Sequence, residues 1–158
     1  MKTCLVFILL GVLTACTVDG DSIAKEAQIP QQEFDAKTEK PAESPTMTLQ
    51  IGENTFSVTL EANETTEALL ELLPLTCSMS ELNGNEKFAY LPQSLPKKEY
   101  SPGEIHAGDI LLYGDDCLVL FYQSFPTSYR YTYIGHIDNI EGLAQLDGAG
   151  DITANFTT

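Results

Sequence analysis

Residues 47–158 consist of short segments in which apolar and polar side chains alternate, separated by clusters of glycine, asparagine, aspartate and proline. Alternation with a period of two is typical of β-strands that bury one face, and the clusters are typical of turns. The pattern predicts strands at residues 48–51, 55–60, 75–79, 87–91, 108–113, 117–122, 129–137 and 151–157. The segment 117–122 is continuously apolar, which indicates a strand buried on both faces. These segments constrain the domain to a mainly β fold.

Two short helical segments interrupt the predicted strands. Asn63 or Thr65 offers an N-cap for the first helix, whose leucines form an apolar stripe before Pro74 ends it. The second is a short helical turn at residues 141–146. About eight short strands at hairpin spacing, with two short helices, predict a closed β-barrel or a sandwich. We expect the helices to cover the ends of the barrel.

Four sequence stretches carry a family resemblance. They are Leu-Pro-Leu-Thr at 73–76, Leu-Asn-Gly-Asn-Glu-Lys at 82–87, Gly-Asp-Ile-Leu-Leu-Tyr at 108–113 and Cys-Leu-Val-Leu-Phe-Tyr at 117–122. Together with the order of the elements, they resemble the bacterial cyclophilin-like domain family over residues 47–156. The resemblance implies a cyclophilin-like closed β-barrel of about eight strands with two short helices. It implies no particular reaction, because one fold hosts many functions.

Cyclophilins proper are peptidyl-prolyl cis–trans isomerases, and their site places an arginine beside an apolar pocket. The arginine weakens amide resonance, which otherwise sets a rotation barrier of about 20 kcal/mol. This chain lacks the Phe-His-Arg and Gln-Gly-Gly stretches of that site, and its one arginine is Arg130, in the late aromatic segment. A divergent isomerase that assists the folding of exported proteins is therefore the alternative function, and it requires Arg130 to reach the pocket.

The first sixteen residues indicate export. Lys2 precedes an apolar run at 5–13, which is typical of a secretory signal and is shorter than the about 20 residues of a membrane span. The sequence Leu-Thr-Ala-Cys at 13–16 resembles the bacterial lipobox, which implies cleavage before Cys16 and its lipidation. We therefore predict a signal peptide at 1–15 and an exported protein anchored to a bacterial membrane through Cys16. The alternative is an ordinary signal peptide with an incidental cysteine.

Residues 16–46 are polar and contain three prolines, with too few apolar side chains to build a core. Such composition is typical of a flexible tether. Residues 47–158 carry 16 acidic and 4 basic residues, which gives a formal charge of −12. This charge argues against nucleic acid and anionic lipid headgroups as partners, because both require basic patches. We therefore expect the protein to contact the membrane only through the lipid attached to Cys16.

The cysteines and histidines of the domain give no clear site. Cys77 and Cys117 lie in strand-like segments, and both a disulfide and two buried free thiols remain open. His106 and His136 are isolated, and no Cys-x-x-Cys pair is present, so we predict no metal and no cofactor. His106 could act as a general base, but the sequence identifies no nucleophile or acidic partner for it.

Aromatic residues are concentrated between positions 121 and 133. Alternation places Tyr129, Tyr131 and Tyr133 on one face of a predicted strand, while Phe121 is expected in the core. Six residues are predicted to bind a ligand: Met79, Phe88, Tyr90, Tyr113, Tyr129 and Tyr131. The leading hypothesis is a binding module that holds a peptide or small molecule on an apolar, tyrosine-rich face, with no catalytic residues. A structural role in a surface complex is a third possibility, and the oligomeric state is open.

Overall fold

The computed structural model describes residues 44–158. The predicted signal peptide, Cys16 and nearly all of the predicted tether lie outside these residues. No helix within residues 44–158 combines the length and the apolar character that a membrane span requires.

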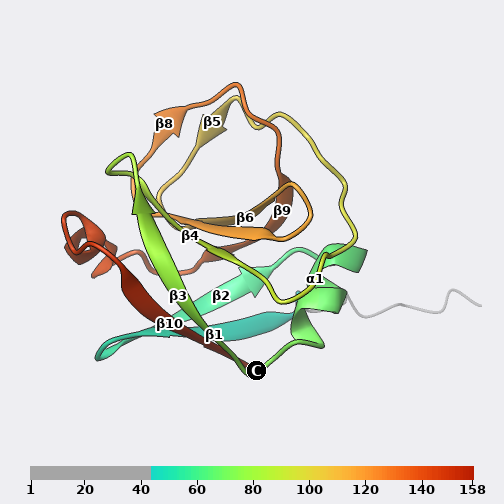
Figure 1. Cartoon of the computed structure of the whole chain (residues 1–158), viewed down its shortest axis with the longest axis horizontal. Coiled ribbons are helices and arrows are strands. Elements are labelled where there is room, and N and C mark those ends of the chain that lie inside the picture. Colours follow the sequence, from blue (N-terminus) through green and yellow to red (C-terminus); the bar gives the residue numbers. More distant parts are fainter. Residues whose placement is uncertain (1–43) are drawn as a thin grey trace, which may run out of the picture. The chain divides into compact units, whose positions relative to one another are not determined.

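Eight strands close into an antiparallel barrel in the order β1-β10-β3-β4-β7-β6-β9-β2 (Figure 1). Their bounds are β1 (Thr46–Ile51), β2 (Asn54–Leu60), β3 (Leu75–Leu82), β4 (Glu86–Tyr90), β6 (Asp109–Tyr113), β7 (Cys117–Phe121), β9 (Thr132–Ile137) and β10 (Ile152–Thr157). The first and last strands pair along the register from Thr48–Thr157 to Ile51–Ala154, so the two ends of the domain meet in the barrel wall. The predicted mainly β barrel of about eight strands is confirmed.

Turn chemistry explains how β4 enters the sheet. Asn83 and Gly84 both have positive φ, 58° and 73°, and asparagine and glycine tolerate this left-handed conformation best. The turn brings Leu82 opposite Glu86 and fixes the register of β3 against β4. The residues after this turn therefore alternate between the two faces of the barrel wall in a defined order.

Two short helices lie at opposite sides of the barrel, α1 (Glu64–Leu70) and the 3-10 helix η1 (Leu143–Leu146), which falls in the red part of the chain (Figure 1). Asn63 is the N-cap of α1, because its side chain accepts a hydrogen bond from the backbone of Thr66 at 2.9 Å. Leu69 of α1 and both leucines of η1 are buried in the barrel core. The helical turn predicted at 141–146 is confirmed in place.

The wall formed by β4, β7 and β6 is covered on both faces. Leu118 and Leu120 of β7 point into the barrel core, whereas Cys117, Val119 and Phe121 point outward into a second core. The second core comprises Ile105, Leu111, Cys117, Val119, Phe121 and Tyr131. A two-stranded sheet of β5 (Glu104–Ile105) and β8 (Phe125–Pro126) lies over this outer face (Figure 1). The prediction that the apolar run of β7 is buried on both faces is confirmed.

The late aromatic segment differs from its prediction. The strand expected from residue 129 begins at Thr132, and Tyr131 forms only an isolated bridge with Tyr100, with backbone hydrogen bonds of 2.8 and 3.0 Å. The register of β6 against β9 also shifts between Ile110, which faces Gly135, and Leu111, which faces Tyr133. Tyr129 and Tyr131 therefore precede the strand and line one cavity, and the predicted strand start is wrong. Tyr133 lines another cavity but packs against the second core to which Tyr131 belongs.

The two cysteines of the domain are free and buried. Cys77 belongs to the barrel core and Cys117 to the second core. Burial raises the pKa of both thiols, that of Cys117 to about 11, where the nearby charges of Asp116 and Glu86 add to the effect of burial. Of the two alternatives left open by the sequence, the structure shows the free thiols.

Candidate functional site

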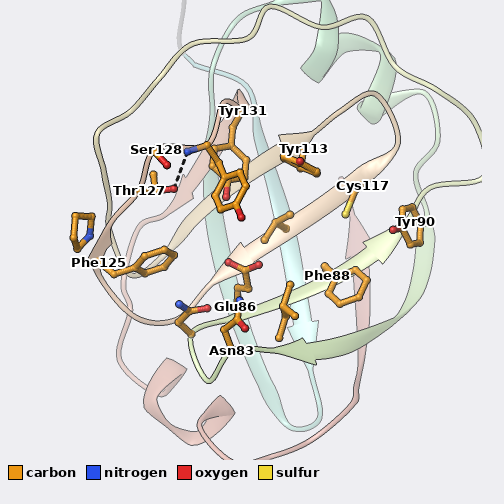
Figure 2. Close-up of a pocket in the computed structure, with 15 residues that line it drawn as sticks. Asn83, Glu86, Phe88, Tyr90, Tyr113, Cys117, Phe125, Thr127, Ser128 and Tyr131 are labelled. Carbon is orange, nitrogen blue, oxygen red and sulfur yellow. Dashed lines mark hydrogen bonds between the residues drawn. The ribbon is translucent and has the colours of Figure 1, made fainter.

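A cavity of about 420 Å³ opens on the outer face of the β4-β7-β6 wall, beside the second core (Figure 2). This volume lies within the range of small-molecule sites, about 300–1,000 Å³. Six aromatic residues line it: Phe88, Tyr90, Tyr113, Phe125, Tyr129 and Tyr131. They come from β4, from the end of β6, and from β8 and the segment after it.

Exposed tyrosine rings form the rim of this cavity. Tyr90, Tyr113 and Tyr129 have exposed fractions of 69%, 47% and 62%. The ring of Tyr113 lies 6.0 Å from that of Tyr129 in an edge-to-face arrangement and 5.7 Å from that of Tyr131. Such spacing is favourable for aromatic pairs, so the rim is held in place by its own contacts.

The segment after β8 is anchored by its backbone. Thr127 donates its N–H to the Gly103 carbonyl at 2.9 Å, and the Thr127 hydroxyl accepts the N–H of Tyr129 at 3.2 Å (Figure 2). Tyr131 is then fixed by its bridge to Tyr100. These bonds hold a segment without regular secondary structure against the barrel wall, with Tyr129 exposed and Tyr131 buried.

The structure brings together five of the six residues predicted to bind a ligand. Met79 is the exception, because it points inward from β3 and is fully buried in the barrel core. Tyr131 lines the cavity but also belongs to the second core, with an exposed fraction of 5% and its ring edge-to-face with Phe121 at 5.7 Å. Phe121 is buried, as expected for a core residue.

Glu86 is a lining residue that the sequence analysis did not single out. It has an exposed fraction of 9%, and Figure 2 shows its carboxylate among the lining side chains, between Phe88, Phe125 and Tyr131. Burial, together with the charge of Glu81, raises the pKa of Glu86 to about 7. Alternation in β4 would have placed Glu86 on the face of Phe88, but the predicted strand began one residue later.

A buried ionic network lies behind the cavity, on the other face of β4. Lys87 is fully buried, forms an ion pair with Glu81, and donates to the Gly150 carbonyl at 2.7 Å. Glu81 also accepts the Tyr122 hydroxyl at 2.7 Å and the Gly84 N–H at 2.9 Å. Burial alone would raise the pKa of Glu81, but the hydrogen bonds from Lys87 and Tyr122 outweigh it and lower the pKa. The network therefore positions the β3-β4 turn.

Comparison with known proteins agrees with this architecture. The model of the cyclophilin-like family matches residues 49–157. The chain belongs to the cyclophilin-like family. Among solved structures, it is similar to the solution structure of the hypothetical protein AF2241 from Archaeoglobus fulgidus, at 18% identity and a TM-score of 0.48, covering 73% of this chain and 95% of that chain. The search of curated proteins found no match.

In this cyclophilin-like domain, Arg130 does not line the aromatic cavity. Its side chain is mostly exposed and donates to the Glu99 carbonyl at 2.9 Å, with the Glu99 carboxylate 4.0 Å from its Nε. The requirement that the sequence analysis set for an isomerase, an arginine reaching the pocket, is therefore not met by this conformation.

The histidines of the domain gather around one carboxylate away from the cavity. Asp109 contacts Nδ1 of His136 at 3.0 Å and accepts the backbone N–H of His106 at 2.8 Å. The imidazole of His106 is 3.8 Å from the same carboxylate and mostly exposed. Within residues 44–158, no group of three or more histidine, cysteine or acidic side chains is arranged to hold a metal ion.

Proposed function

We propose that this cyclophilin-like protein is a binding module that holds a peptide or small ligand in the aromatic cavity, tethered to a membrane through a lipid on Cys16. The observation that carries the proposal is the cavity of about 420 Å³ with a rim of exposed tyrosines. Exposed aromatic surface around a concave site is typical of recognition surfaces, because tyrosine supplies a rigid apolar body and a polar end.

The position of Arg130 favours binding over prolyl isomerisation. An isomerase of the cyclophilin type needs a cation beside the pocket that seats the proline ring, and Arg130 bonds to the Glu99 carbonyl instead. The charged group that does line the cavity is Glu86, which is acidic. A carboxylate cannot supply the cationic contact that weakens amide resonance.

The binding proposal is tested by an NMR titration of the purified protein with a set of small aromatic fragments and short peptides. The variant Tyr90→Ala/Tyr129→Ala removes two exposed rim rings and should abolish binding without unfolding the domain. Ile140→Ala is the matched control, since Ile140 is exposed to a similar extent as Tyr113 and lies outside the cavity. Unchanged binding in the double variant would contradict the site.

The isomerase alternative is tested on proline-containing peptides with Arg130→Ala as the control. We expect no acceleration of cis–trans exchange by the native protein. Acceleration that disappears in Arg130→Ala would establish a divergent isomerase and overturn the binding proposal.

The anchor rests on the Leu-Thr-Ala-Cys sequence at residues 13–16. Cells that express the native chain and are fed labelled palmitate should yield a labelled, membrane-associated protein, and Cys16→Ser should be unlabelled. Label retained by Cys16→Ser would contradict lipidation at this cysteine.

A further inference from the structure

The floor of the aromatic cavity presents a carboxylate, that of Glu86, with no fixed donor. Within residues 44–158, the Glu86 carboxylate takes part in no ion pair and no side-chain hydrogen bond, and the nearest lysine in sequence, Lys87, points to the opposite face and pairs with Glu81. The neighbouring Asn85 also lines the cavity, and its Oδ1 is buried without a hydrogen-bond partner. Burying a carboxylate without a hydrogen-bond donor is unfavourable, so the Glu86 side chain, with an exposed fraction of 9%, indicates a missing donor.

The walls around the Glu86 carboxylate are aromatic. Phe88 and Tyr90 follow Glu86 on the same face of β4, and their rings are 6.0 Å apart. Tyr113 and Tyr129 complete the exposed rim. Aromatic faces carry negative charge density and attract cations within about 6 Å. The cavity thus combines a carboxylate and aromatic rings, in a domain with a formal charge of −12 over residues 47–158.

We propose that the cavity selects ligands that carry a primary ammonium group beside an apolar body, an inference that rests on the proposed binding function. The ammonium donates to the Glu86 carboxylate in a charge-assisted hydrogen bond. The apolar body lies against the rings of the rim. Phosphorylated or carboxylated ligands are excluded by the negative charge of the floor.

Among the groups around the cavity whose pKa values are shifted, Glu86 is the one that titrates near neutral pH. The pKa of Cys117 is raised to about 11 and that of Tyr131 to about 12, in both cases chiefly by burial. Burial also raises the pKa of Tyr122, while that of Glu81 is lowered. His106 and His136 contact Asp109 and do not line the cavity. Ammonium binding should therefore strengthen as Glu86 ionises and weaken as it is protonated.

The test compares benzylamine, which is cationic, with benzyl alcohol, which has the same size and is neutral. NMR titrations use the full protein at pH 5.5 and pH 8. We expect benzylamine to bind at least tenfold more tightly than benzyl alcohol at pH 8 and to lose most of this advantage at pH 5.5. Glu86→Gln should abolish the advantage while benzyl alcohol binding persists. Glu53→Gln, which removes an exposed charge in the β1-β2 turn, should bind both probes as the native protein does.

The outcomes separate this inference from the binding function on which it rests. Equal affinity for the two probes, or an amine preference that survives in Glu86→Gln, overturns ammonium selectivity and leaves an apolar binding cavity. The absence of shifts at the cavity with either probe overturns both. Because glutamine resembles the protonated glutamic acid, the variant should fold, and the pH dependence of the native protein provides a second measurement that needs no substitution.

Discussion

The unpaired carboxylate of Glu86 should make the stability of this domain depend on pH in a direction opposite to that of carboxylates held in ion pairs, such as Glu81. The ordinary pKa of the group is 4.5, and burial raises it to about 7 in the folded protein. Between these values the folded state holds a proton that the unfolded state has released. Stability therefore falls as pH rises from about 4.5 to about 7, and it levels off above that.

The size of the effect follows from the two pKa values. Each pH unit between 4.5 and about 7 corresponds to about 1.4 kcal/mol, so ionised Glu86 would cost the folded state about 3 kcal/mol. The cavity is open to solvent on one side, which screens the charge, and we expect about 2 kcal/mol. Glu86→Gln should thus stabilise the protein by about 2 kcal/mol at pH 8, or raise Tm by about 8 °C. At pH 4.5 the native protein and the variant should be nearly equal.

Urea unfolding of the native protein, Glu86→Gln and Glu53→Gln at pH 4.5, 6 and 8 measures this difference directly. Glu53 is exposed, so Glu53→Gln should track the native protein at every pH. A Glu86→Gln variant that is no more stable at pH 8, or whose advantage is the same at pH 4.5, would refute the conclusion that Glu86 is buried without a partner.

Three further predictions concern the rest of the barrel. Glu81→Gln should destabilise the protein by about 3 kcal/mol at pH 7 in urea unfolding, because it leaves the buried charge of Lys87 unpaired. This loss of stability should shrink as pH falls below the ordinary carboxylate range, and a variant as stable as the native protein at pH 7 would contradict the ionic network. Gly135→Ala should cost about 1–3 kcal/mol in the same assay, since the added Cβ meets the backbone carbonyl of Thr59, and an unchanged midpoint would show that the strands can separate. Because its pKa is raised, Cys117 should react with iodoacetamide at pH 7.5 at least about a hundredfold more slowly than free cysteine. Mass spectrometry of the native protein measures this rate, and rapid alkylation of Cys117 would contradict the raised pKa.

Local signals in the sequence predicted most of the barrel. The Asn83-Gly84 turn and the continuously apolar run of β7 each indicated one conformation, and the structure agrees with both. The 3-10 helix at Leu143–Leu146 also falls where a short helical turn was expected. These features are decided by residues close together in the chain, which is why the sequence alone identifies them.

Features decided by distant contacts were missed. Lys87 reads as a surface residue, and only the pairing of β3 with β4 and the approach of Gly150 make it a buried partner of Glu81. Met79 lies on a strand that was expected to border the ligand face, but its position in the alternation of β3 turns it into the barrel. The strand predicted to start at Tyr129 starts later, since the chain first crosses the outer face.

The aromatic cavity was predicted only in part for the same reason. Its tyrosines are conspicuous in the sequence, whereas the role of Glu86 depends on burial by residues from β8 and the segment after it. Tyr131, which the sequence predicted to bind a ligand, lines the cavity and also belongs to the second core. Substituting it with alanine would disturb packing, so Tyr129 is the better position for testing the ligand face.

The location of a bound probe tests the central claim most directly. Intermolecular NOEs between benzylamine and the aromatic protons of the protein report which rings it contacts. We expect NOEs to Tyr90, Tyr113 and Tyr129, and none to Tyr100 and Tyr133, which line the other cavity. NOEs confined to Tyr100 and Tyr133, or absent from all five rings, would contradict the assignment of the outer face of β4, β6 and β7 as the ligand site.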